Sequence, residues 1–137
     1  MVNDVTIYPF KFKHLHHLIE LLHSNNYQGI SDISMRTLPK VGFIVFSGKA
    51  PLAAGFLRRL EPCYAQIDTL TSNKFLGSML RNQGITMIVD ELISEAKRLK
   101  LEGLICHTSH QDVLKRAESL GFHTVEQKII ALPLIKI

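Results

Sequence analysis

The clearest pattern in this sequence is a helical repeat of apolar positions in its second half. From Gly84 onward, apolar residues recur at intervals of three and four: Ile85, Ile88, Val89, Leu92, Ile93, Ala96 and Leu99. This spacing places them on one face of an α-helix. Lys97, Arg98 and Lys100 gather at its end, where the helix dipole favours positive charge. The pattern therefore predicts an amphipathic helix of about four turns that begins near Gly84.

Three apolar runs before this helix predict a meander of antiparallel strands. They cover Val41–Ser47, Pro51–Leu60 and Tyr64–Thr71. Gly48-Lys49-Ala50 separates the first two runs and suits a hairpin turn.

The N-terminal part of the chain predicts one strand and one helix. Val5–Tyr8 is strand-like and ends at Pro9, and apolar residues then repeat at helical spacing over Leu15–Leu22. The polar segment 25–40 predicts a loop with one short helical stretch at Ile33–Leu38.

The C-terminal part predicts three further elements. Leu104–Cys106 reads as a short buried strand and Gln111–Leu120 as an amphipathic helix that Gly121 ends. A final strand is expected over Phe122–Leu134.

The order of these elements indicates an α/β fold. We expect a mixed central sheet of about six strands with three to four helices on its faces. The strand–helix–strand passage over residues 64–106 should be a right-handed crossover with parallel outer strands. A length of 137 residues fits one domain, residues 1–137.

Composition narrows the classes of function. The formal net charge is +4 and the pI about 9.2, which is compatible with an anionic ligand. The basic residues are spread along the chain and Trp is absent, so nucleic-acid binding is a minor alternative. Because no apolar run approaches the ~20 residues of a membrane span, and no signal peptide is evident, we expect no membrane partner and a cytoplasmic protein.

Metal binding and nucleophilic hydrolysis find little support in the residues. The histidines around the first predicted helix, His14, His16, His17 and His23, lack a HExxH motif, and we expect them to be solvated or to face a partner. Cys63 and Cys106 form no CxxC pair. No G-x-S-x-G elbow is present. No metal site is predicted.

The segment Arg81-Asn82-Gln83-Gly84-Ile85-Thr86 is a candidate anion site. It lies between the strand that ends near Thr71 and the long helix. A glycine-containing turn that opens a helix leaves backbone N–H groups unpaired at the positive end of the dipole, where they can bind phosphate. An ordinary helix start would give the same pattern, and the motif matches neither a Walker loop nor GxGxxG.

With this motif and element order, the sequence resembles the GNAT superfamily of acetyl-coenzyme A (acetyl-CoA) dependent N-acetyltransferases. The pyrophosphate loop of that family reads Q/R-x-x-G-x-G/A, which Arg81 and Gly84 match and Thr86 does not. Leu120-Gly121-Phe122 matches a triplet that commonly closes the family's last helix. Thr108-Ser109-His110 resembles a stretch of small phage-borne GNAT-like modules.

The resemblance implies a set of site residues. Residues 81–86 would bind the pyrophosphate of acetyl-CoA, and the backbone N–H groups of Leu70 and Thr71 would bind the thioester carbonyl. A neutral amine nucleophile needs a base. Asp68 and His107 are the candidates, although either could be an ordinary surface polar group. His110 stands where the family often has an asparagine near the pantetheine arm.

The resemblance also implies a function and its alternative. We expect transfer of acetyl from acetyl-CoA to a primary amine, on an unidentified small molecule or protein, by direct attack on the thioester. A homodimer is compatible with the sequence. Ala117 stands where many members have a tyrosine proton donor, and Ser72–Leu80 is longer than the usual loop. The alternative is therefore a catalytically degenerate GNAT-like structural or protein-binding module.

Overall fold

The computed structural model describes residues 4–26, 33–60, 62–107, 111–125 and 132. The chain divides into two compact units, Met1–Cys106 and His107–Ile137, and each is described by itself. Among the described residues, the first unit contains the sheet and two α-helices, and the second contains one α-helix.

Over the ranges described, the sheet of the first unit has five strands, in the order in which they occur in the sequence. Neighbouring strands β1 to β4 pair antiparallel, and β5 pairs with β4 in parallel. This confirms the meander and the parallel strands around a helical crossover. The strands are β1 (Val5–Pro9), β2 (Val41–Ser47), β3 (Ala50–Leu60), β4 (Tyr64–Ser72) and β5 (Gly103–Cys106).

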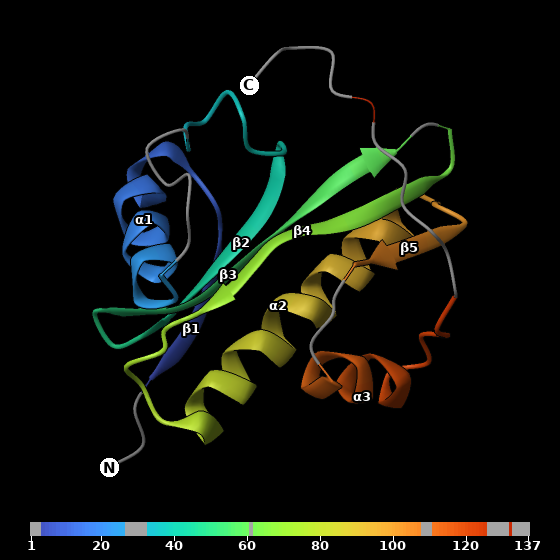
Figure 1. Ribbon diagram of the computed structural model, residues 1–137. Coiled ribbons are helices and arrows are strands. Elements are labelled where there is room, and N and C mark those ends of the chain that lie inside the picture. Colours follow the sequence, from blue (N-terminus) through green and yellow to red (C-terminus); the bar gives the residue numbers. More distant parts are fainter. Residues whose placement is uncertain (1–3, 27–32, 61, 108–110, 126–131, 133–137) are drawn as a thin grey trace. The chain divides into compact units, whose positions relative to one another are not determined.

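Strand β3 is buried on both faces because a helix covers each of them. Phe56 belongs to a buried cluster with Leu18 and Leu22 of α1 (Leu15–Ser24). Its neighbour Gly55 lies instead against Ile88 of α2 (Ser78–Arg98). Since successive strand residues point to opposite faces, α1 and α2 cover opposite sides of the sheet (Figure 1).

Helix α2 begins at Ser78, six residues before the predicted start at Gly84. The expected turn over Arg81–Thr86 is therefore wrong, since these residues lie inside the helix. The apolar repeat fails before Gly84 because most side chains in that part of α2 are exposed. Ser78 and Gln83 are exposed, and Met79 is 86% exposed.

Gly84 is a point of close packing between α2 and the sheet. It is buried, and a Cβ atom built on it would lie 2.8 Å from Leu52 Cγ and 3.2 Å from Ala53 Cβ. Both neighbours belong to β3. The glycine that suggested a phosphate-binding turn is therefore explained by helix–sheet packing.

Gly84→Ala should destabilise the fold by about 1–2 kcal/mol, because overpacking against Leu52 outweighs the gain of up to about 1 kcal/mol in helix propensity. Urea denaturation measures the change. Gln83→Ala, on the exposed neighbouring position, is the matched control. A stabilised Gly84→Ala variant would contradict the packing role, whereas adding Leu52→Ala should reduce the penalty of the alanine.

The described part of the connection from α1 to β2 contains a turn. A turn at Ser34–Leu38 replaces the short helical stretch predicted there, and the amides of Thr37 and Leu38 both donate to the Ser34 carbonyl.

In the second unit, α3 (Gln111–Ser119) confirms the predicted helix.

Gly121 ends α3 as expected. Its φ of 96° is in the left-handed region, and the Phe122 amide donates to the Ala117 carbonyl. Of the predicted strand Phe122–Leu134, residues Phe122–Val125 have no regular structure and most of the rest lies outside the described residues. Among the helices described, none is both long and apolar enough to cross a membrane.

The histidines around α1 are not all solvated. His14 closes the short 3₁₀ helix η1 (Phe12–His14) and is buried among the rings of Tyr8, Phe10 and Phe46. Its Nδ1 accepts a hydrogen bond of 3.0 Å from the Lys11 amide, which requires that nitrogen to be unprotonated. The expectation that these residues are solvated is therefore wrong for His14.

His17 shares this environment. Its ring packs edge-on against Phe46 at 5.0 Å, and its Nδ1 is buried without a hydrogen-bond partner among the described residues. Burial, and then the charge of Lys13, lowers the pKa of His14. Burial, and then the charge of His16, lowers the pKa of His17, against an opposing effect of Glu20. The fold therefore favours the neutral form of both rings.

The free energy of unfolding should consequently fall as the pH is lowered from 7.5 to 5. The unfolded chain takes up protons near the ordinary histidine pKa of 6.5, whereas the folded chain takes them up at lower pH. Urea denaturation at several pH values measures this. His14→Phe should flatten the dependence, and an unchanged slope in that variant would contradict the assignment.

Candidate functional site

The second half of β4 is an irregular part of the sheet. Among the described residues, the pairing of β4 with β5 ends at Ile67 and Cys106, although β4 continues to Ser72. The β5-facing edge of β4 therefore has no strand partner beyond Ile67 in the part of the chain described. Backbone groups that lack a strand partner can form hydrogen bonds with a ligand instead.

A β-bulge lies in this same stretch. Asp68 pairs with Phe56 and Thr71 pairs with Ala54, so Thr69 and Leu70 together face the single residue Gly55. Thr69 has a φ of 51°, which is uncommon for a β-branched residue. Strained backbone of this kind is concentrated at functional sites. The bulge thus includes Leu70, one of the two residues that were expected to present N–H groups, whereas the other, Thr71, is paired with Ala54 of β3.

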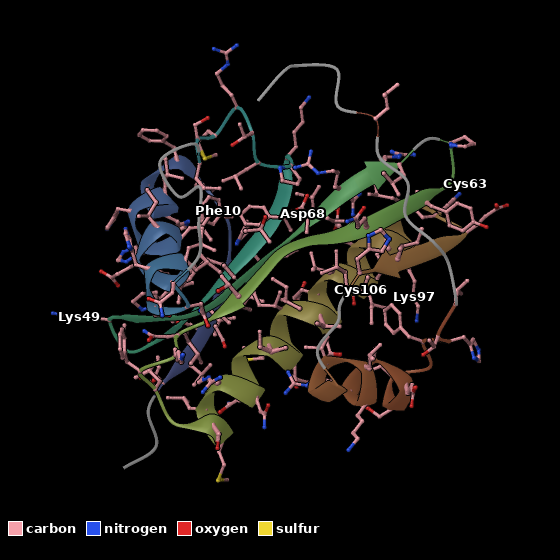
Figure 2. The ribbon with its side chains drawn as sticks, in the orientation of Figure 1. Phe10, Lys49, Cys63, Asp68, Lys97 and Cys106 are labelled. Carbon is pink, nitrogen blue, oxygen red and sulfur yellow. The ribbon has the colours of Figure 1, made fainter. Side chains whose placement is uncertain are left out.

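Asp68, labelled in Figure 2, is held on both carboxylate oxygens. Arg58 Nε lies 2.5 Å from Oδ2, and Thr69 Oγ1 donates to Oδ1 at 2.7 Å. Partial burial raises the pKa of this carboxyl, but the hydrogen bonds from Thr69 and Arg58 and the charge of Arg58 outweigh it. The pKa of Asp68 therefore lies below its ordinary value, which makes the carboxylate a weaker base.

The end of β4 is fixed to the end of α1 by polar side chains. Asn25 Nδ2 donates to Thr71 Oγ1 at 3.1 Å and to the Ser72 carbonyl at 2.7 Å. Ser24 Oγ accepts from the Lys74 amide at 3.1 Å. Ser24 and Thr71 are both buried. These bonds hold the strand and the start of the connection to α2 in one arrangement.

The first turn of α2 follows this connection and is compatible with an anion. The Arg81 amide donates to the Gly77 carbonyl, so the amides of Ser78, Met79 and Leu80 precede the first intrahelical bond. The first turn contains no acidic residue. The side chain of Arg81 is half-buried, and its Nε lies 3.5 Å from Ser72 Oγ.

The remaining predicted residues are dispersed. Along α2, Asn82, Gln83 and Thr86 are exposed and Ile85 is half-buried. His107 is exposed and belongs to the second unit, and His110 lies outside the described residues.

The structure therefore brings together Asp68, Leu70 and Thr71 on β4. It places Arg81 and Thr86 on α2 rather than in a turn. Among the residues described, no group of three or more His, Cys, Asp or Glu side chains could hold a metal ion.

Comparison with known proteins gives different results for the sequence and for the fold. No protein-family model matches the chain, and no significant match was found among curated proteins. Solved structures match along nearly its whole length. A GNAT-family acetyltransferase from Streptococcus pneumoniae has a TM-score of 0.76 at 12% identity, covering 96% of this chain and 100% of that one. The chain has the GNAT fold.

Two other solved structures show how varied the proteins with this fold are. An aminoglycoside N-acetyltransferase in complex with CoA has a TM-score of 0.67 at 13% identity, covering 97% of both chains. A transcriptional regulator from Bacillus halodurans has a TM-score of 0.67 at 18% identity, covering 94% of this chain and 99% of that one. At such identities the GNAT likeness establishes the fold alone.

Two features of the site were not predicted from the sequence. The bulge at Thr69–Leu70 depends on the register between β3 and β4, for which Gly55 in a strand pattern was the only available signal. The partners of Asp68 come from different positions, Arg58 across the strand pair and Thr69 beside it. A charged pair on neighbouring strands could have been proposed only after the register was known.

Replacement of Thr69 by valine should raise the pKa of Asp68 toward its ordinary value. The variant keeps the β-branched shape and removes the hydroxyl that donates to Oδ1. Carboxyl-detected NMR titration measures the pKa. Thr86→Val, on the exposed surface of α2, should leave it unchanged. An unaltered titration in Thr69→Val would remove that hydrogen bond from the description.

Proposed function

We propose that this chain is an N-acetyltransferase that moves acetyl from acetyl-CoA to a primary amine. The observation that supports this most directly is the bulge at Thr69–Leu70, located where β4 extends beyond its pairing with β5 in a GNAT fold. A structure with this fold was solved in complex with CoA. Acetyl-CoA is a co-substrate in this proposal.

The proposed reaction is a direct displacement. The neutral amine nitrogen forms a bond to the thioester carbon and loses one proton, the C–S bond breaks, and CoA leaves as a thiolate that takes up one proton. Negative charge develops on the carbonyl oxygen, and the backbone N–H group of Leu70 in the bulge would stabilise it, whereas Thr71 is paired with Ala54 of β3. Because the hydrogen bonds of Asn25 and Ser24 fix this part of β4, the donor would be oriented before substrate binds.

The amine must lose a proton before it attacks. A free lysine-like amine has a pKa of about 10.4 and is almost wholly protonated near neutral pH. Asp68 is ionised and only 24% exposed, so in the proposal it attracts the ammonium form and acts as a weak base, directly or through water. His107 remains the second candidate base and His110 a candidate pantetheine contact, both inferred from sequence.

The pyrophosphate would bind to the first turn of α2. The amides of Ser78, Met79 and Leu80 and the guanidinium of Arg81 provide donors and positive charge there. The proposed pyrophosphate site therefore consists of Arg81 and the turn before it, and not of the whole segment 81–86. Gly84 remains a packing residue.

A second candidate function is a GNAT-shaped binding module without catalysis. Ala117, on α3, provides no proton donor where the resemblance implies a tyrosine. The carboxylate of Asp68, the proposed base, already forms an ion pair with Arg58. The transcriptional regulator from Bacillus halodurans shows that a protein with this fold can be described by a role other than acetyl transfer.

Acetyl-CoA should stabilise the folded chain. At 100 times its Kd it should add about 2.7 kcal/mol, which corresponds to a rise in Tm of several degrees. Arg81→Ala should weaken binding about five- to twentyfold through loss of a charge-assisted contact. Lys97→Ala, at the other end of the same helix, should bind acetyl-CoA normally.

A shortened probe separates the two halves of the proposed site. S-acetylpantetheine lacks the pyrophosphate, so Arg81→Ala should leave its affinity unchanged. If acetyl-CoA does not shift the Tm of the folded wild-type chain, the catalytic proposal fails and the binding module becomes the favoured function. Binding that Arg81→Ala does not weaken would keep the activity and overturn the pyrophosphate seat.

The acceptor, the oligomeric state and the compartment are further parts of the proposal. We propose a small-molecule or protein amine as acceptor, a homodimer and a cytoplasmic location. A panel of amines assayed by release of free CoA thiol would identify the acceptor class.

A further inference from the structure

Arg58 joins three segments that are distant in the sequence. Its Nε pairs with Asp68 Oδ2 on β4, and its Nη2 donates to the Thr37 carbonyl at 3.0 Å. Arg58 itself lies on β3. One planar guanidinium thus contacts both the carboxylate beside the bulge and the turn that precedes β2.

The register explains why these groups meet. Asp68 pairs with Phe56, and Arg58 pairs with Gln66, so Arg58 and Asp68 are diagonal neighbours on one face of the sheet. Phe56 places that face on the side covered by α1. The turn at Ser34–Leu38 lies in the connection from α1 to β2, and it reaches Arg58 through the Thr37 carbonyl.

The turn is held together by its own hydrogen bonds. The Thr37 and Leu38 amides donate to the Ser34 carbonyl at 3.0 and 3.2 Å, and Thr37 Oγ1 donates to the same oxygen at 2.9 Å. The Ser34 amide donates back to Thr37 Oγ1 at 3.1 Å. A compact turn of this kind moves as a unit, so a contact at its carbonyl positions all of it.

We propose that Arg58 is a positioning residue that couples the turn at Ser34–Leu38 to Asp68. This inference rests on the proposed function for the role of Asp68, but the coupling itself is a property of the fold. A cationic acceptor that pairs with Asp68 competes with Arg58 for the carboxylate. Acceptor binding therefore alters the hydrogen bond from Arg58 to the Thr37 carbonyl. Conversely, the conformation of the turn affects the affinity for the acceptor.

Hydrogen exchange at the Thr37 and Leu38 amides tests the coupling without any substrate. Arg58→Met should speed their exchange about two- to fivefold, the range expected for a partly exposed charged contact. Arg59→Met removes an equal charge from the next residue of β3, which points to the opposite face, and should leave the exchange unchanged. Unchanged exchange in β2 would show that both variants are folded.

Asp68→Ala provides the decisive comparison, because Arg58, and not Asp68, contacts the Thr37 carbonyl. If Arg58 transmits the effect, Asp68→Ala should also speed exchange at Thr37, and the double variant Arg58→Met/Asp68→Ala should be no faster than Arg58→Met alone. Unchanged exchange in Asp68→Ala, or effects that multiply in the double variant, would overturn the coupling.

Arg58→Lys separates the two contacts of the guanidinium. Lysine keeps the positive charge but lacks the planar fork, so the titration of Asp68 should stay close to wild type while exchange at Thr37 becomes as fast as in Arg58→Met. In Arg58→Met the pKa of Asp68 should rise. A lysine variant that matches wild type in both measurements would show that charge alone is needed and would overturn the positioning role.

Activity provides a separate readout once an acceptor is known. Arg58→Met should raise KM for the acceptor more than it lowers kcat, and the affinity for acetyl-CoA should be unchanged. Failure of acetyl-CoA to bind the wild-type chain would refute the proposed function and leave the exchange results standing. Normal acetyl transfer with an unaltered acceptor KM in Arg58→Met would instead refute the link between this residue and acceptor binding.

Discussion

The burial of β3 on both faces is the constraint on which the rest of the first unit depends. Phe56 packs toward α1 and Gly55 toward α2, so the strand must be apolar or small at nearly every position over its first eight residues. Burial on both sides fixes the register, since a shift by one residue would exchange the two faces. With β3 fixed, the irregular half of β4 is placed beside it, and the bulge opposite Gly55 has a defined position.

The order of the elements could be predicted from the sequence, but the places where they contact one another could not. The strands of the meander were found because each has an apolar run of adequate length, and β5 was correctly expected to run parallel to β4. The start of α2 was misplaced because its first six residues make no apolar stripe. Apolar periodicity indicates which part of a helix is packed, and it gives no signal for a turn whose side chains are exposed.

The candidate site shows the same division. Asp68, Leu70 and Thr71 were selected by position on a strand, and the structure places Leu70 in the bulge and the other two at the pairs that flank it. Gly84 was selected by motif, and its buried contact with Leu52 gives it a different explanation. His14 looked like a solvated residue because its three aromatic neighbours come from β1, β2 and the segment between β1 and η1. Such contacts become visible only when a strand pairing is known.

The polar bonds between the end of α1 and the end of β4 also have a consequence for the thermodynamics of ligand binding. Asn25 and Ser24 hold Thr71, Ser72 and Lys74 through both side-chain and backbone groups. The conformational entropy of this stretch is therefore lost when the chain folds and not when a ligand arrives. A ligand that binds there meets donors already in place, and little of its binding free energy is consumed in ordering the protein.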